Sequence, residues 1–327
     1  MADKKRILTG DTPTGRLHIG HYVGTLENRV RLQNEYETFI LQADTHALTT
    51  LAKTPQVVED HTLQVVLDNL AAGLDPKNVV FWVESGVPEV YELAALFSMY
   101  VSHNRALRNP TVKDEIKMKG LGDQFSLGFV NYPIYQAVDI LGVKAHLVPV
   151  GVDQVPHLEQ SREIARDLNA LTETELFPIP EALVGKVGKL VGTDGNPKMG
   201  KSLGNTIYLS ESKEEVQRKI MGMYTDPKRI HANDPGTVEG NPVFVYLDTF
   251  GAESDKAQIE DFKGKYREGK VGDIEVKKYL ADVMERFISP MRERRQGFES
   301  DLDSVRGLMK EGTMRARDEN AKTLKEL

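Results

Sequence analysis

Cysteine is absent from this sequence of 327 residues, and tryptophan occurs only once. The absence of cysteine excludes a disulfide scaffold and a thiolate nucleophile, and it fits a reducing compartment. Long apolar runs are also missing, since the most apolar stretch, 93–101, is far too short to cross a bilayer. The basic start of the chain is not followed by the apolar run of a secretory signal. We therefore expect a soluble, cytoplasmic protein with no membrane segment.

The balance of charges is acidic, with a formal net charge of −7. This balance argues against a protein that coats nucleic acid indiscriminately, because the phosphate backbone attracts basic surfaces. Basic residues nevertheless gather at 108–120 and 290–297. Each cluster is consistent either with a solvated helix face or with a local patch that contacts one folded RNA.

Short apolar segments alternate with helical patterns before about Tyr208, after which the pattern becomes helical. We expect strands in 5–10, 39–50, 78–85 and 145–154, and a helix in 61–74. This alternation predicts an α/β fold, with a parallel sheet covered by helices on both faces. Ligands of such sheets bind beyond the carboxyl ends of the strands, where Gln42, Asp44 and His46 fall in the second expected strand.

Two short segments contain residues suited to binding phosphate, and the first is 17–24, with His18, Gly20 and His21. A zinc site is a poor match, because glycine weakens a helix and no cysteine can complete the ligand set. Small residues that expose backbone N–H groups, with imidazole donors beside them, suit phosphate oxygens better.

The second segment, 192–207, is rich in glycine and asparagine and contains Lys198, Lys201 and Ser202. Two lysines on such a loop are typical of a mobile clamp for a polyphosphate, because the loop can bring point charges onto the phosphates. A solvent-exposed loop with incidental lysines is the alternative interpretation.

The motifs at His18–His21 and Lys198–Ser202, in this order around an α/β pattern, resemble the paired signatures of class I aminoacyl-tRNA synthetases. Within that class, the chain is similar to the tryptophanyl-tRNA synthetase family over nearly its whole length. The segments that carry this similarity are 9–33, 43–49, 131–141, 148–169, 224–230, 234–250 and 312–327.

The resemblance implies a Rossmann-type doubly wound parallel sheet with an inserted connective segment, plus an α-helical C-terminal domain. It implies that 1–208 is the catalytic domain, with the insertion at about 45–130. It further implies an anticodon-binding domain at 209–292 and a C-terminal helix at 293–327 that returns to the catalytic domain. Such a protein activates L-tryptophan with ATP and Mg²⁺, transfers it to tRNA(Trp), and works as a homodimer.

The same resemblance assigns roles to individual residues. It implies catalytic contacts with the ATP phosphates from His18, His21, Lys198 and Lys201. The implied ATP-binding residues are Thr12, Pro13, Thr14, Gly20, His21, Gly151, Val152, Asp153, Val187, Lys198, Met199, Gly200, Lys201 and Ser202. The implied tryptophan-binding residues are Tyr132, Gln136, Asp139 and Gln154.

Asp139 is implied to accept the indole N–H, and its surroundings in the sequence agree with that role. Tyr132, Gln136 and Asp139 can lie on one side of a helix, because residues three and four apart are neighbours there. A carboxylate in a pocket for an apolar amino acid is costly unless a donor meets it, and indole offers one donor and no acceptor. An aspartate that pairs with a nearby arginine or caps a helix is the alternative.

Two positions depart from the family pattern. Thr12 stands where many bacterial relatives have glutamine, and Gly200 stands where serine is usual. Gly200 keeps its backbone N–H but lacks a hydroxyl, so we expect one ATP contact fewer and a more mobile loop.

Three other functions remain alternatives. A tyrosine-activating tRNA synthetase shares the spacing of Tyr132, Gln136 and Asp139. A small nucleotidyltransferase has a similar histidine motif but lacks the later lysine loop and the helical tail. A non-charging synthetase paralogue would bind tryptophan or tRNA without forming an adenylate.

Other conspicuous residues have simpler expected roles. We expect Trp82 to pack in the core. We expect His46, His61 and His103 to be structural or surface residues, and Arg292, Arg294 and Arg295 to belong to a tRNA-binding surface.

Overall fold

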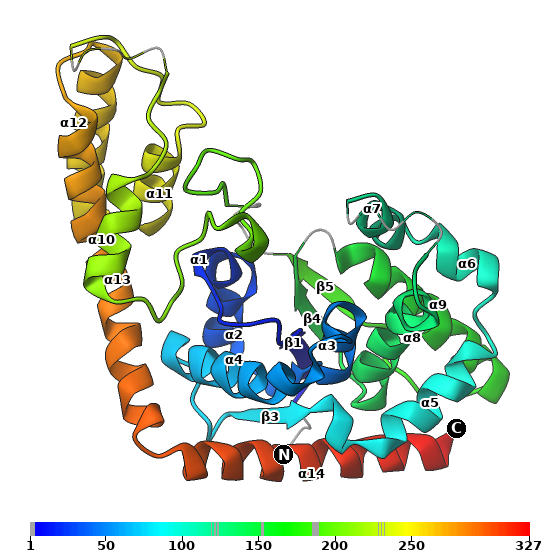
Figure 1. Ribbon diagram of the computed structural model, residues 1–327. Helices are drawn as coiled ribbons and strands as arrows, with labels where there is room; N and C mark the ends of the chain where they lie inside the picture. The colour runs from blue at the N-terminus through cyan, green and yellow to red at the C-terminus, as the bar shows by residue number, and fades with distance from the viewer. Residues whose placement is uncertain are drawn as a thin grey trace. The chain divides into compact units, whose positions relative to one another are not determined.

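The computed structural model describes residues 4–118, 120, 122, 124–151, 154–184, 190–227, 229, 231 and 233–327. The chain divides into two compact units, whose elements are labelled in Figure 1. Unit 1 comprises Met1–Arg16, Gly24–Gly188 and Phe298–Leu327, and unit 2 comprises Leu17–Val23 and Lys189–Gly297. The histidine motif and the lysine loop therefore belong to the same unit, although they lie far apart in the sequence.

Five strands in the described part of unit 1 form a parallel sheet with the order β3-β2-β1-β4-β5. They are β1 (Arg6–Asp11), β2 (Glu37–Gln42), β3 (Val79–Val83), β4 (Leu147–Val150) and β5 (Glu181–Val184). β1 pairs with β2 up to Asp11 opposite Gln42, so the two strands end level with each other. The order reverses between β1 and β4, which is the switch point where doubly wound sheets bind ligands.

Helices follow the strands as the alternating pattern predicts, and the expected fold class is confirmed. The helices of unit 1 are α2 (Glu27–Leu32), α3 (Asp44–Leu51), α4 (Val58–Ala72), α5 (Pro88–Ser98), α6 (His103–Arg108), α7 (Pro110–Met118), α8 (Leu127–Gly142), α9 (Val155–Thr172) and α14 (Leu302–Glu326). One expected boundary is wrong: the strand of 39–50 ends at Gln42, and Asp44 and His46 lie in α3. An aspartate in the first turn of a helix is favoured by the helix dipole, which explains the early start of α3.

The two faces of the sheet bury different side chains, because successive residues of a strand point to opposite sides. Phe39 and Trp82 pack in one core cluster with α5, α8 and α9. Ile40 and Phe81 pack in the other, with α4 and Val305 of α14. Trp82 is fully buried, so its expected role in core packing is confirmed.

Helix α14 runs along β3, as Figure 1 shows in red beneath the cyan strand. Gly312 permits this close approach, since a Cβ there would lie 1.9 Å from the Phe81 carbonyl oxygen. The Val83 N–H donates a hydrogen bond to Thr313 Oγ1 at 3.0 Å, which adds a polar contact to the packing. The last helix is thus part of the same unit as the sheet.

Unit 2 is mainly helical. It contains α1 (Ile19–His21), α10 (Lys213–Met221), α11 (Pro242–Phe250), α12 (Lys256–Arg267) and nearly all of α13 (Asp273–Glu299), and a π-helical turn, Tyr22–Leu26, begins in it. Its buried side chains include Phe244, Tyr246, Tyr266 and Leu280. Among the residues described, no helix is both long and apolar enough to cross a membrane.

Candidate active site

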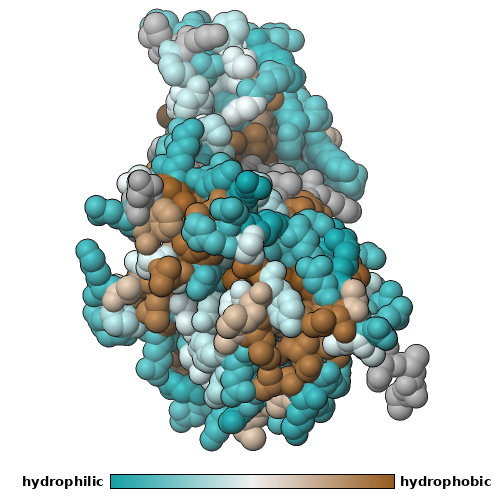
Figure 2. Space-filling view, turned by 90° about the vertical axis from the view of Figure 1, so that its right-hand side faces the viewer, coloured by the Kyte–Doolittle hydropathy of each residue, from teal (hydrophilic) through white to brown (hydrophobic). Residues whose placement is uncertain are grey.

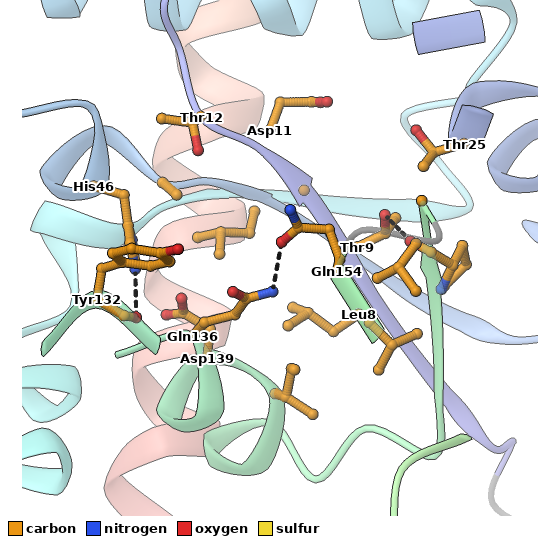
Figure 3. A pocket seen from close by; sticks show the side chains of 18 of the residues that line it. Leu8, Thr9, Asp11, Thr12, Thr25, His46, Tyr132, Gln136, Asp139 and Gln154 are labelled. Atoms are coloured by element: carbon orange, nitrogen blue, oxygen red, sulfur yellow. Dashed lines mark hydrogen bonds between the residues drawn. The ribbon is translucent and has the colours of Figure 1, made fainter. Parts of the chain in front are cut away.

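A cavity of about 380 Å³ opens at the carboxyl ends of β1, β2 and β4 in unit 1. Its position is the switch point of the sheet, and its size lies in the range of small-molecule pockets. Figure 3 shows the side chains that surround it. The cavity is lined by all four residues expected to bind tryptophan, Tyr132, Gln136, Asp139 and Gln154, together with Thr12, Thr14 and Gly151 from the expected ATP set.

Helix α8 supplies three of these side chains. Its first turn is capped by Ser126, whose hydroxyl accepts the Phe129 N–H at 3.1 Å. From this helix Tyr132, Gln136 and Asp139 face the cavity, as the helical spacing predicts. Gln136 Nε2 lies 3.4 Å from Gln154 Oε1, so these two amides meet across the pocket.

The hydroxyl of Tyr132 is held in place from outside the pocket. It lies 3.1 Å from Nε2 of the fully buried His157. The other nitrogen of that ring, Nδ1, accepts from Asn109 Nδ2 at 2.9 Å, which leaves the proton of the neutral ring on Nε2. His157 therefore donates to the Tyr132 oxygen and fixes its orientation.

Asp139 is the least satisfied polar group of the cavity. It is 1% exposed, and neither carboxylate oxygen has a hydrogen-bond partner among the described residues. Burial raises its pKa well above the usual value, the charges of Glu84 and Asp44 raise it further, and His46 opposes them. Neither the arginine pair nor the helix cap considered above is found in the described structure, so a donor from a bound molecule fits this carboxylate.

His46 also lines the cavity. The expectation that it is a structural or surface residue does not include this position. Its Nδ1 lies 2.9 Å from Glu84 Oε2, and its Nε2 lies 3.1 Å from the Tyr132 carbonyl oxygen. Burial alone would lower the pKa of His46, but the Glu84 carboxylate outweighs it and raises that pKa to about 9. His46 follows the end of β2, so its place in the sequence was a usable signal.

One atom each of His46, Glu84 and Asp139 lie within 4.8 Å of one another. This triad does not favour a metal, because both ring nitrogens of His46 already face hydrogen-bond acceptors and offer no lone pair. Among the described residues, no other group of three histidine, aspartate or glutamate side chains comes so close together.

Asp11, at the end of β1, is fixed beside the cavity by a buried arginine. Arg29 is 1% exposed and binds both oxygens of Asp11, at 2.6 and 3.0 Å. Arg29 also donates to Asn69 Oδ1 and to the Gly10 carbonyl oxygen. The charge of Asp11 is therefore compensated, in contrast to that of Asp139.

In unit 2, the histidine motif is tied to the chain that follows the lysine loop. The Ile19 N–H donates to the Ile207 carbonyl, and the Leu209 N–H donates to the Leu17 carbonyl. A Cβ on Gly20 would lie 3.1 Å from Met199 Sδ, so the motif and the loop are in contact. The histidine motif, the lysine loop and the chain that follows the loop are therefore in direct contact within unit 2.

The two histidines of the motif present the same ring nitrogen. His18 Nδ1 accepts the Gly20 N–H at 3.2 Å, and His21 Nδ1 accepts the His18 N–H at 3.1 Å. Each ring therefore carries a proton on Nε2, which can donate to an anion. Burial, followed by the nearby His21 and Lys201, lowers the pKa of His18 to about 2, so this imidazole is neutral.

Asn205 organises the lysine loop. Its side chain is buried, donates to Asp194 Oδ1 and to the Lys198 carbonyl, and accepts the Gly200 N–H at 2.9 Å. The Gly200 N–H, which the sequence suggested for ATP, is therefore engaged within the loop in this structure. Lys201 is half-buried and lies close enough to lower the pKa of His18, whereas Lys198 is exposed.

The structure describes only part of the expected ATP set. Val152, Asp153 and Val187, from the expected ATP set, lie outside the described residues. Pro13 is buried, whereas Thr12 and Thr14 are exposed.

The expected basic surface at the end of α13 is wrong for Arg295, whereas Arg292 is partly exposed and its charge is paired. Arg295 is 4% exposed, and Arg292 binds Glu285 and the Glu211 carbonyl. Arg294 is exposed and stays a candidate. The stretch is basic in sequence, but α13 turns successive side chains to different sides and buries part of the charge.

The chain belongs to the family of class I tRNA synthetases for tryptophan and tyrosine, whose family model matches residues 2–289. It is 48% identical to the tryptophan–tRNA ligase of Streptococcus pyogenes, over 99% of this chain and 97% of that protein. It is 46% identical to the tryptophan–tRNA ligase of Clostridium longisporum, over 99% of this chain and 96% of that protein. A solved structure of tryptophanyl-tRNA synthetase from Campylobacter jejuni, complexed with ADP and tryptophan, matches with a TM-score of 0.85 and 31% identity over 98% of each chain.

Proposed function

We propose that this chain activates L-tryptophan with ATP to give tryptophanyl-adenylate and pyrophosphate, and then transfers tryptophan to tRNA(Trp). The observation that carries the choice of amino acid is the buried Asp139, an acceptor that meets no donor among the described residues, in a cavity at the switch point. Of the two amino acids that the family serves, tryptophan brings a single N–H donor to it, whereas the phenol of tyrosine both donates and accepts.

Activation needs positioning and positive charge more than it needs acid–base chemistry. The ionised tryptophan carboxylate attacks the α-phosphorus of ATP, and the bond to the bridging oxygen breaks as pyrophosphate leaves with its electron pair. No proton has to be removed, so no general base or nucleophilic side chain is required. The negative charge that develops on pyrophosphate is the part of the reaction that the protein must stabilise.

We assign that task to the motif pair of unit 2. The Nε2–H groups of His18 and His21 donate to phosphate oxygens, and Lys198 and Lys201 neutralise the leaving pyrophosphate. Met199, Gly200 and Ser202 are assigned with the lysines to the pyrophosphate. Gly20 is assigned to ATP as well, and its lack of a side chain lets the lysine loop approach the histidine motif. Thr12, Pro13 and Thr14 are assigned to other contacts with ATP. Gly151, Val152 and Asp153 are assigned to the ribose, and Val187 to the adenine.

In unit 1, Tyr132 and Gln154 are assigned to the α-amino group, with Gln136 beside them, and Asp139 to the indole N–H. The amides of Gln136 and Gln154 already face each other, and the Tyr132 hydroxyl is fixed by His157. This arrangement leaves the apolar faces of Leu8, Leu41 and Ile140 to cover the ring.

Mg²⁺ is proposed to enter with ATP rather than to occupy a protein cage. The one acidic triad found among the described residues includes a histidine without a free lone pair. Mg²⁺ typically binds nucleotides through the phosphates and water, and there it would neutralise phosphate charge.

We further propose that the protein is a homodimer in the cytoplasm and that the helices of unit 2 contact the tRNA. Exposed apolar side chains occur at the end of α5 and the start of α8, namely Leu96, Met99, Tyr100 and Leu127. Figure 2 shows apolar side chains gathered on one face of the molecule, as at subunit interfaces. Sedimentation of the wild type and of Met99→Glu tests this pairing, because the charge should shift the chain to a monomer.

Amino-acid-dependent exchange of pyrophosphate into ATP tests the central proposal. Each of the twenty amino acids is supplied in turn, and we expect tryptophan to drive exchange far better than tyrosine. Exchange driven best by tyrosine would make this chain a tyrosine-activating enzyme. Tryptophan binding without exchange would make it a non-charging paralogue.

A further inference from the structure

The triad His46, Glu84 and Asp139 combines two carboxyl groups with one imidazole, and none of the three side chains is more than 11% exposed. His46 faces an acceptor at each ring nitrogen, Glu84 Oε2 and the Tyr132 carbonyl oxygen, so both nitrogens carry protons and the ring is an imidazolium. Glu84 is fully buried, and its second oxygen has no partner among the described residues. Asp139 has no partner for either oxygen.

Among the described residues that line the cavity, no further cation compensates the second carboxylate of the triad. The described lining of the cavity contains neither lysine nor arginine. The titratable groups that face Asp139 from neighbouring elements are Asp44 and His46 of α3, Glu84, Tyr91 of α5 and Tyr132 of α8. Asp44 adds negative charge but is compensated by the Ser85 N–H and hydroxyl. One imidazolium thus serves two buried carboxylates.

We propose that the empty cavity holds a proton on Asp139, and that tryptophan displaces this proton to solvent when its indole N–H binds. Glu84 is a positioning residue for this proton release. Its carboxylate pairs with the imidazolium of His46, so that the positive charge lies next to Glu84 rather than next to Asp139. This inference rests on the proposed tryptophan specificity and deepens it, since it makes amino-acid recognition depend on proton release.

The proton balance follows from the charges. In the empty cavity the triad contains His46 as the cation, Glu84 as the anion and Asp139 as the neutral acid, with a net charge of zero. When tryptophan binds, Asp139 loses its proton to solvent and accepts the indole N–H. Because tryptophan enters as a neutral zwitterion, the complex becomes one unit more negative than the empty cavity. Burial and the Glu84 charge both raise the pKa of Asp139, in agreement with a protonated empty state.

In the variant Glu84→Gln, tryptophan should bind without releasing a proton to solvent, because one of the two carboxylates is absent. The remaining pair, His46 and Asp139, then shares one proton at net charge zero in the empty cavity. Binding of tryptophan leaves this proton on His46, so none reaches the solvent. The proton count, rather than the affinity, therefore distinguishes a charge-setting role of Glu84 from a merely structural one.

Titration calorimetry of the full chain with L-tryptophan at pH 6.0, in buffers of different ionisation enthalpy, measures the protons released. We expect about one proton for the wild type and an affinity that rises up to ~10-fold per pH unit over the range of release. A tryptophan analogue with sulfur in place of the indole nitrogen should release none. Glu84→Gln should release none with tryptophan, whereas Asp44→Asn, as the matched control, should still release about one.

The inference is overturned if the wild type binds tryptophan without proton release, or if the sulfur analogue releases as many protons as tryptophan. The comparison of tryptophan with its sulfur analogue uses only the wild type. It therefore tests the inference even if Glu84→Gln does not fold. Pyrophosphate exchange is measured on the same preparation. Exchange with tryptophan but no proton release contradicts this inference alone, whereas neither binding nor exchange with tryptophan contradicts the proposed function as well.

Discussion

The cavity of unit 1 and the motif pair of unit 2 place their polar groups in opposite environments. In the cavity the key carboxylate, Asp139, is buried and lacks a donor among the described residues. In unit 2 the ring nitrogens of His18 and His21 are fixed by backbone N–H groups, and the lysines lie on a loop that is partly exposed. Because Asp139 is shielded from water, the cavity of unit 1 should favour a ligand that brings one hydrogen-bond donor. The partly exposed lysines and histidines of unit 2 can instead neutralise a large, hydrated anion. Substitutions in the two units should therefore change different kinetic constants.

The largest effect is expected in unit 2. Lys201→Ala should lower kcat for pyrophosphate exchange ~10²–10³-fold with a smaller change in the KM for ATP, because a donor to the developing charge is lost. Lys213→Ala, an exposed lysine at the start of α10, is the control and should leave exchange near the wild-type rate. A raised KM with unchanged kcat would show that Lys201 only binds ATP.

The next effect is expected in unit 1 and should appear in amino-acid binding. Asp139→Ala removes the proposed acceptor for the indole N–H and should weaken tryptophan binding by about 1.5–3 kcal/mol, as for a hydrogen bond to a charged group. Equilibrium dialysis with labelled tryptophan measures it, and Thr50→Ala, at the same cavity, should cost much less. An unchanged affinity would remove Asp139 from the recognition of indole.

The ion pair of unit 1 should also appear in the dependence of stability on pH. The folded pKa of His46, about 9, lies above the unfolded value near 6.5, so the folded state retains a proton that the unfolded state loses. Stability from this pair is present below pH ~6.5 and is lost as pH rises through ~9, a decrease of about 1–3 kcal/mol. Urea unfolding at both ends of this pH range measures the change in the free energy of unfolding. In His46→Gln the decrease should be smaller, because the contribution of the His46–Glu84 pair is absent. An equal decrease in that variant would assign the effect to other groups.

The smallest effect concerns the exposed arginine at the end of α13. Arg294→Gln should reduce tRNA aminoacylation a few-fold and lower its salt slope by about one, since the variant would lose one proposed phosphate contact. Pyrophosphate exchange should not change, because it does not involve tRNA. Arg306→Gln on α14 is the control for the loss of one exposed charge. A parallel loss of exchange would point instead to a folding defect.

Local patterns in the sequence predict the helical region and four of the five described strands, but not β5. Strands β1, β3 and β4 lie within or next to their expected ranges, because apolar runs bounded by turns are local signals. The spacing of Tyr132, Gln136 and Asp139 likewise predicts their common face on α8. The pairing of His46 with Glu84 could not be predicted, because it joins side chains from two segments through burial. The burial of Arg295 was missed for a similar reason, since composition does not say which way a helix turns each side chain.

The binding of tryptophan and of its sulfur analogue to the wild type and to Asp139→Ala tests the central claim most directly. The claim is that the unmatched carboxylate of unit 1 selects the amino acid by accepting its one N–H. The account predicts that the wild type prefers tryptophan over the analogue ~10- to ~100-fold, on the scale of a charged hydrogen bond, and that the variant binds the two nearly alike. An equal preference in both proteins would contradict it, because Asp139 would then have no part in recognising the indole nitrogen.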